Sequence, residues 1–160
     1  MSNSVDHPLS SSLEQQIQRI TSAIHDACTT AQRAPDTVQL LAVTKTHPIE
    51  TIQAAYALGL RRFGENYVQE GVDKIIALHR LIPDNQAIWH FIGPLQSNKT
   101  RSIAEHFAWV HGIDRLKIAQ RLSEQRPVHL PSLNVLIQVN ISDESSKSGC
   151  TPDSALELAL

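Results

Sequence analysis

The chain has 160 residues, of which 41% are hydrophobic and 19% are charged, a composition typical of one soluble globular domain. Its 14 Lys and Arg residues are scattered along the chain and balanced by 16 Asp and Glu residues, and this net charge of −2 argues against a nucleic-acid-binding protein. No apolar run approaches the roughly 18 residues that a membrane span needs, and the polar N-terminus lacks the pattern of a secretion signal. We therefore expect a cytoplasmic protein.

The cysteines and the aromatic content narrow the class further. Cys28 and Cys150 lie far apart, with no neighbouring Cys or paired His, so neither a disulfide framework nor a zinc site is predicted. Cys28 is expected to be a small buried hydrophobic residue. Because only 4% of the residues are aromatic, the core is left to Leu, Ile, Val and Ala, which suits helices packed on parallel strands.

The first predicted element follows a polar segment, residues 1 to 10, that we expect to be frayed. Apolar residues then recur at every third or fourth position from Leu13 to Ala31, which predicts a long helix capped by the Ser10–Ser12 run. After a break at Ala34–Asp36, the almost wholly apolar run Val38–Thr44 predicts a buried parallel strand.

Helices and strands alternate along the rest of the chain, and this order predicts parallel strands joined by helical crossovers. The expected helices cover about Pro48–Leu58, Tyr67–Leu81, Asn98–Phe107 and Asp114–Gln125, and Asp114 is expected to cap the last of these. The expected strands cover about Arg61–Glu65, Ala87–Ile92, Ala108–Ile113 and Leu133–Ile141, of which the last is the longest. A final helix is expected to begin near Pro152. Five strands fit either a doubly wound sheet or an unfinished barrel. A full (β/α)8 barrel needs about 250 residues, so the end at Leu160 indicates truncation.

Lys45 is the only one of the five lysines that directly follows an apolar strand. An amine at the carboxyl end of a buried strand is partly desolvated, which favours the neutral nucleophile needed for Schiff-base formation. The alternative, on position alone, is a surface lysine whose ammonium group reaches the solvent.

Two further polar residues lie at or near strand ends. Asn66 follows Phe63–Glu65 and offers both a donor and an acceptor to a ligand, or caps the next helix. His90 interrupts an otherwise apolar strand just before the turn Gly93–Pro94, where it is either a ligand contact or a satisfied core residue.

The fifth strand ends in a third polar group. Asn140 lies at its end, and the hydroxyl-rich loop Ser142–Gly149, which contains Lys147, follows it. Such a loop is either a flap that closes over a ligand or a solvated run of turn-forming residues. The residues themselves therefore indicate an α/β domain with a candidate ligand site at its strand ends, formed by Lys45, Asn66, His90 and Asn140.

Several common sites are excluded by spacing. The six glycines form neither a GxGxxG nor a GxxxxGK loop, which removes the usual nucleotide-binding routes. The eight histidines never fall at HxH or HxxxH spacing, so no local metal motif is present. No GxSxG nucleophile elbow occurs either.

Four strings at the predicted strand ends carry a resemblance to a known family. LLAVTKTHP (40–48), FGENYVQE (63–70), WHFIGPLQSNK (89–99) and VNISDESSKSG (139–149) closely resemble motifs of the pyridoxal phosphate homeostasis protein family, and the resemblance covers about residues 38–150. That family is similar in fold to the alanine racemase N-terminal domain, a TIM barrel. The resemblance therefore implies an α/β protein with a (β/α)8 barrel of this type, here truncated to about the first five β/α units in a single domain.

The resemblance also implies a cofactor and residues that bind it. Lys45 would form a Schiff base with pyridoxal 5'-phosphate (PLP), and Asn66, His90 and Asn140 would lie near the cofactor. Lys147 matches a second lysine of the family motif and would act as an accessory or transfer lysine. No catalytic residue and no metal ligand is implied.

The family holds the cofactor phosphate in loops after the late strands, and an arginine from that region faces the pyridine nitrogen. Both lie beyond residue 160, so this chain is expected to carry only the part of the site that captures the aldehyde. We expect the 160 residues alone to bind PLP weakly and to aggregate through unpaired sheet edges, whereas the family implies a monomer.

The resemblance favours a non-catalytic PLP-binding protein in intracellular vitamin B6 homeostasis, with apo PLP enzymes as recipients and with no nucleic-acid or membrane partner. One alternative is a PLP-dependent enzyme such as an amino-acid racemase, and another is a structural α/β module. A racemase needs a base on each face of the substrate α-carbon. In similar enzymes the second base comes from another domain, for which this chain has no counterpart.

Overall fold

The computed structural model describes residues 8–142, 144 and 146–160. Five parallel strands form one sheet in the order in which they occur in the chain. These strands are β1 (Ala42–Val43), β2 (Arg62–Glu65), β3 (Ile88–Phe91), β4 (Trp109–Ile113) and β5 (Asn134–Ile137). A doubly wound sheet would reverse direction at a switch point, whereas strand order in a barrel follows the chain. The strand order therefore decides between the two architectures in favour of the barrel.

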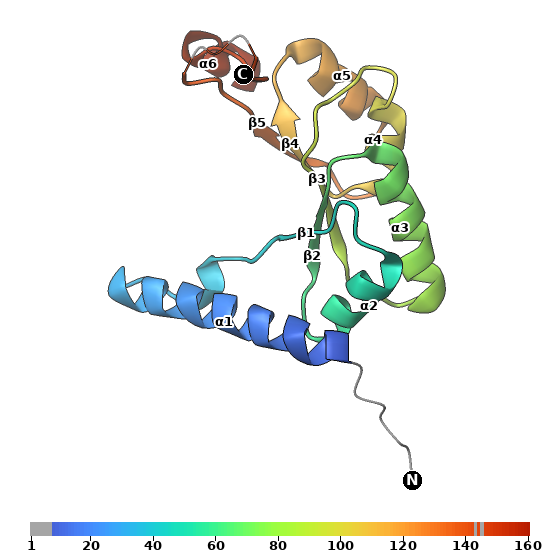
Figure 1. Cartoon of the computed structure of the whole chain (residues 1–160). Helices are drawn as coiled ribbons and strands as arrows, with labels where there is room; N and C mark the ends of the chain where they lie inside the picture. The colour runs from blue at the N-terminus through green and yellow to red at the C-terminus, as the bar shows by residue number, and fades with distance from the viewer. Residues whose placement is uncertain (1–7, 143, 145) are drawn as a thin grey trace.

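The helices between the strands cover one face of the sheet (Figure 1). They are α2 (Ile49–Ala57), α3 (Val68–Leu81), α4 (Thr100–His106) and α5 (Leu116–Gln125); α1 (Pro8–Thr30) and the short 3-10 helix η1 (Pro35–Thr37) precede β1, and α6 (Pro152–Ala159) follows β5. Helix α2 packs against α3, α3 against α4, and α4 against α5, as right-handed crossovers in one direction require. Among the described residues, no helix is long and apolar enough to cross a membrane.

The hydrophobic core lies between the sheet and these helices. Phe63, Phe91 and Val110 on the middle strands are almost fully buried, and Phe91 packs edge-on against Phe107 with ring centroids 5.5 Å apart. Side chains alternate between the two faces of a strand, so the residue next to each of these three along its own strand projects from the opposite face of the sheet. In β3 that residue is His90.

The first and last strands are shorter than predicted, and both lie at an edge of the sheet. Only Ala42–Val43 of the predicted run Val38–Thr44 pairs as a strand, and Val43 is 48% exposed, so the expectation of a strand buried on both faces is wrong. The last strand covers Asn134–Ile137 instead of Leu133–Ile141 and is not the longest. Strands β1 and β5 each have only one neighbouring strand, so parts of their apolar runs are left without a pairing partner.

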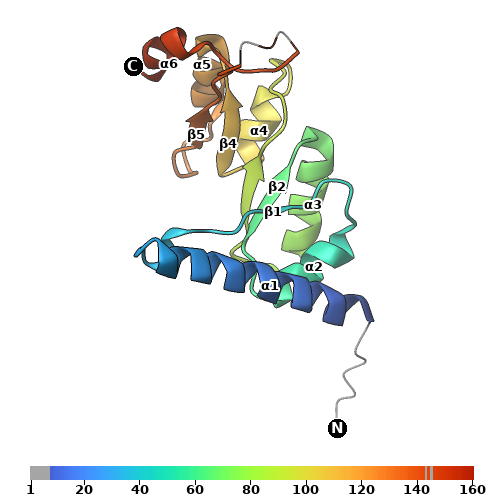
Figure 2. The ribbon, with the colours of Figure 1, turned by 60° about the vertical axis from the view of Figure 1, so that its left-hand side comes forward.

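Two helix boundaries also differ from the prediction. Helix α1 lies across the end of the sheet in Figure 2. It begins at Pro8, and proline is tolerated in the first turn of a helix. Residues 8–10 are therefore helical, and the prediction that they are frayed is wrong. Residues 1–7 of that predicted segment lie outside the described residues. Helix α5 begins after Arg115, so Asp114 is not its cap as predicted. Cys28 is buried, as expected.

Candidate functional site

Lys45 lies in the turn that directly follows β1. The N–H of Thr44 donates to the carbonyl oxygen of Gly64 at 2.9 Å, which extends the pairing with β2 up to the residue before Lys45. Lys45 itself is exposed, so the expected partial desolvation is wrong for the described chain. The next residue, Thr46, has φ 64°, a left-handed conformation that a β-branched side chain rarely adopts. The lysine thus projects from a tightly shaped turn at the carboxyl end of a parallel strand.

Asn66 occupies the corresponding place on the neighbouring strand. Val43 and Gly64 are in register across β1 and β2, so Lys45 and Asn66 each lie two residues beyond the same paired position. The N-cap of α3 is Tyr67, and it has no side-chain cap bond, so the capping alternative for Asn66 is wrong. The Oδ1 atom of Asn66 is buried and has no hydrogen-bond partner among the described residues, so its capacity to accept a hydrogen bond is unused.

The turn after β3 packs directly against Asn66. A methyl group added at Gly93 would lie 2.8 Å from the Cα and carbonyl carbon of Asn66, closer than real contacts allow. Glycine therefore permits the two strand ends to approach each other here. The N–H of Ile92 donates to the carbonyl oxygen of Glu65 at 2.8 Å and holds the same two strand ends together.

His90 lies in a polar and aromatic cluster on the face of the sheet away from the helices. Its Nδ1 is 2.9 Å from Nε2 of His111, its Nε2 is 3.4 Å from the guanidinium of Arg62, and its ring stacks on Trp109. Burial, followed by the nearby His111 and Arg62, lowers the pKa of His90 from 6.5 to about 4. Burial also lowers the pKa of His111. His90 is therefore a partnered, neutral residue at pH 7.

The position of His90 relative to Lys45 follows from the strand register. His90 is paired with Gly64, so it lies two residues before the level of Lys45 and Asn66, which is about 7 Å along the strand direction. The cluster around His90 thus forms a layer beneath the two strand ends.

Asn140 and Lys147 lie at the other edge of the sheet. Three strands separate β1 from β5, so the structure does not place them beside Lys45. The side-chain amide of Asn140 donates to the carbonyl oxygen of Glu144 at 3.0 Å, and its N–H donates to that of Cys150 at 2.9 Å, so Asn140 closes its own loop. Lys147 is exposed. In the loop predicted to close over a ligand, residues 143 and 145 lie outside the described residues.

A buried network that the sequence interpretation missed lies on the helix side of the Lys45 turn. The ammonium group of Lys74, on α3, donates to the carbonyl oxygen of Thr44 at 2.7 Å, to Glu65 Oε1 at 2.9 Å and to Glu70 Oε1 at 2.6 Å. Thr44 Oγ1 donates to Glu65 Oε1 at 2.6 Å, and the N–H of Thr46 donates to Glu70 Oε1 at 2.6 Å. The residues on both sides of Lys45 are therefore tied to α3 and β2.

The charges in this network stabilise one another. The hydrogen bond from Lys74, and then the one from the Thr46 backbone, hold the pKa of Glu70 below its ordinary value. Glu70 and Lys74 are four residues apart on a helix, a spacing that indicates an ion pair and could have identified half of the network from sequence. The partner on β2, Glu65, could not be identified in that way because it is distant from Thr44 in sequence and adjacent only in the fold.

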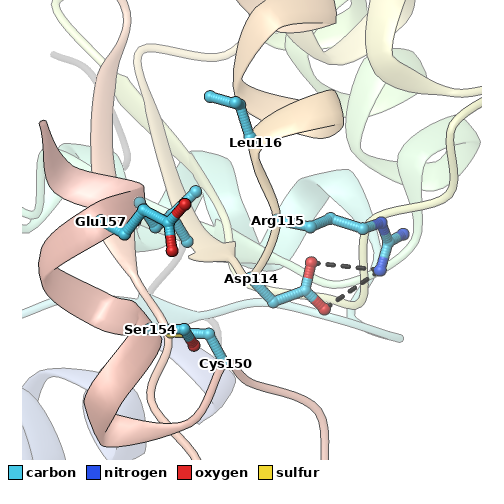
Figure 3. A pocket seen from close by; sticks show the side chains of 7 residues that line it. Asp114, Arg115, Leu116, Cys150, Ser154 and Glu157 are labelled. Atoms are coloured by element: carbon cyan, nitrogen blue, oxygen red, sulfur yellow. Dashed lines mark hydrogen bonds and ion pairs between the residues drawn. The ribbon is translucent and has the colours of Figure 1, made fainter.

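A separate shallow hollow of about 180 Å³ lies where the end of β4 meets α6 (Figure 3). Asp114, Cys150, Ser154 and Glu157 line it, and Arg115 lies 3.1 and 3.2 Å from the two carboxylate oxygens of Asp114. None of the predicted site residues lines this hollow. Within the described residues, no group of three or more His, Cys, Asp or Glu side chains could hold a metal ion.

These features define a parallel α/β barrel protein in which an exposed lysine and an asparagine oxygen without a partner in the described part of the chain lie at neighbouring strand ends. Residues 6–160 match the family model described as alanine racemase, N-terminal domain, so the chain belongs to that family. The predicted fold class, an α/β barrel of this type, is confirmed, and the chain carries five of its β/α units.

Curated relatives are similar over most of this chain. The pyridoxal phosphate homeostasis protein of Vibrio alginolyticus is 58% identical over 149 residues, which cover 93% of this chain and 64% of that protein. The protein with the same name in Pseudomonas aeruginosa is 57% identical, with 93% and 63% covered. The predicted resemblance to this family is therefore confirmed, and the chain spans less than two thirds of the length of these relatives.

Solved structures are similar as well. An unknown protein from Bifidobacterium adolescentis superimposes with a TM-score of 0.86 at 31% identity, over 99% of this chain and 66% of that one. PipY of Synechococcus elongatus PCC7942, determined with PLP bound, superimposes with a TM-score of 0.68 at 38% identity, over 85% of this chain and 62% of that one.

Proposed function

We propose that this chain is the PLP-capturing part of a protein that maintains intracellular PLP, with Lys45 as the covalent attachment point. The observation that carries the proposal is that the exposed Lys45, after β1, lies at the same level as Asn66, after β2. The Oδ1 atom of Asn66 is buried and has no partner among the described residues. The names of the curated relatives and the PLP bound to PipY support the choice of ligand.

The residues of this chain fit such a cofactor in chemical terms. Bound PLP supplies an aldehyde that reacts with a primary amine, and Lys45 offers that amine at the carboxyl end of a parallel strand, where ligands bind in this class of fold. Asn66 would supply a hydrogen-bonding partner for a polar group of the cofactor, and His90 would form a neutral, buried layer beneath it. The roles of Asn140 and Lys147 stay predictions, because both residues lie across the sheet from Lys45.

We propose further that the protein binds and releases PLP without turning over amino acids, and that apo PLP enzymes receive it. Lys45 would provide a single base for one face of a substrate α-carbon. His90, the best internal candidate for a second base, is buried in the middle of β3 and engaged with His111. The alternative, a PLP-dependent racemase, is favoured only by membership of the alanine racemase N-terminal domain family. A cytoplasmic location and a monomeric state stay predictions.

Covalent trapping tests the attachment point. We would incubate the full-length protein with PLP, reduce it with borohydride and map the pyridoxyl group by peptide mass spectrometry. The label should be found on Lys45, and Lys45→Ala should remove most of it, whereas Lys117→Ala, at an exposed lysine on α5, should not change it. A pyridoxyl group mainly on Lys147 or Lys99 in the parent protein would refute the assignment.

Isotope exchange tests the absence of turnover. The full-length protein would be incubated with PLP and L-alanine in deuterated water, with free PLP as the reference. We expect α-deuteration and racemisation at the rate of free PLP. A rate well above that reference, lost in Lys45→Ala, would favour the enzyme instead.

A further inference from the structure

The buried network around Lys74 joins three segments that are distant in sequence. The ammonium group has three N–H donors, and all three are used: one on the turn after β1, one on β2 and one within α3. The side chain of Lys74 is 9% exposed and that of Glu65 is fully buried. Lys74 therefore acts as a three-way junction between the turn that carries Lys45 and the two elements beneath it.

Stability alone does not explain this network. The Lys74 and Glu65 side chains are both buried, and Glu65 Oε2 has no partner among the described residues. Desolvation makes buried ion pairs of this kind costly, and hydrophobic replacements of similar size are often equally stable. The network is thus better understood through what it holds in place.

The contacts converge on the two residues that flank Lys45. Thr44 is held through its carbonyl oxygen and its hydroxyl group, and Thr46 is held through its backbone N–H. Thr46 is also the residue with the left-handed backbone, so the carboxylate of Glu70 stabilises a conformation that costs energy when unsupported. With both neighbours anchored on the helix side, Lys45 is left as the exposed residue of the turn.

We propose that Lys74, Glu65 and Glu70 are positioning residues that hold the turn Thr44–Thr46 in the shape that presents Lys45 for covalent attachment. Lys74 does not take part in attachment itself, because its amine is enclosed by carboxylates and a carbonyl oxygen. This inference rests on the proposed function in so far as Lys45 is the attachment point. The anchoring of the turn is a property of the protein without PLP and is measurable separately.

Two variants of the full-length protein test the proposal. The double variant Glu65→Leu/Lys74→Met replaces the buried pair with apolar side chains and is designed to keep the fold. Glu70→Gln keeps the size of the side chain and removes only the charge that the Thr46 N–H and Lys74 contact. Matched controls are Glu124→Leu/Lys117→Met and Glu124→Gln, which alter exposed residues of α5.

Two measurements decide the outcome. Hydrogen exchange at the Thr46 amide, without PLP, should accelerate about tenfold or more in both test variants. Glu70→Gln removes the charge of the acceptor, and the double variant removes the Lys74 contacts that hold Glu70 and Thr44 in place. The apparent Kd for PLP, titrated by absorbance, should rise about tenfold in both, while the urea midpoint of the variants stays close to that of the parent. The controls should change neither measurement.

Unchanged exchange at Thr46 in both test variants would overturn the proposal, and so would an unchanged Kd alongside faster exchange. A rise in Kd that only follows a lower urea midpoint would also count against it. If the parent protein takes up no PLP, the proposed function fails, but faster Thr46 exchange in the variants would still support the anchoring of the turn.

Discussion

His90 makes the stability of this fold depend on pH in a calculable way. The perturbation is acidification from pH 7 to pH 5. In the unfolded chain a histidine takes up a proton as the pH falls through about 6.5, whereas burial and the neighbouring His111 keep the pKa of folded His90 at about 4. Between these two values the unfolded state binds more protons than the folded state, so stability decreases as the pH falls.

The magnitude follows from the two pKa values. Each pKa unit is worth about 1.36 kcal/mol, and acidification to pH 5 crosses about 1.5 units of the window between the pKa of 6.5 and the pKa of about 4. His90 should therefore remove about 2 kcal/mol of unfolding free energy between pH 7 and pH 5. The residue is only 5% exposed, which justifies treating the shift as a property of a buried group.

Urea unfolding at a series of pH values between 7 and 5 provides the assay. The parent protein should lose more stability across this range than His90→Asn, by about 2 kcal/mol, because the variant has no imidazole to protonate at this position. The comparison uses the pH slope, so a lower stability of the variant at pH 7 does not affect it. Exposed His129→Asn serves as the control and should keep the slope of the parent. Equal slopes for the parent and His90→Asn would refute the reasoning.

Two further predictions concern local geometry. Gly93→Ala should destabilise the protein by about 3 kcal/mol or more in urea unfolding and reduce pyridoxyl labelling of Lys45. The added methyl group would overlap the backbone of Asn66, which cannot move as a side chain could. A variant as stable as the parent would show that this close approach is not required. Thr151→Ala should lower the free energy of unfolding by about 1 kcal/mol in the same assay, because the Thr151 side chain accepts from the N–H of Ser154 at the start of α6. A loss in Thr151→Ala that is absent from Thr151→Ser would identify the cap as the cause. Equal losses in both variants would contradict it.

The site was only partly predictable. Lys45 and Asn66 are predictable as site residues because each directly follows a predicted strand, and parallel strands bring such residues to the same edge of a sheet. His90 was noticed as a polar residue in an apolar strand, but its contacts with Arg62 and His111 depend on the register of three strands. Asn140 matches the same strand-end pattern, yet three strands lie between it and β1, and its side chain bonds to its own loop. Position at a strand end is thus necessary for such a site but does not establish proximity.

The amino-acid sequence by itself determined the order of helices and strands, the parallel arrangement and the motifs at the strand ends. These properties depend on local periodicity and on short strings of residues, both of which can be recognised without knowing any contact. The tertiary structure alone decided where the edge strands stop pairing and that Lys74 lies buried beneath the Lys45 turn. Pairing, burial and charge neutralisation are set by neighbours from distant parts of the chain. For that reason Lys74, a helix lysine, lies buried at the centre of the network, whereas Lys45, which was expected to be partly desolvated, is exposed.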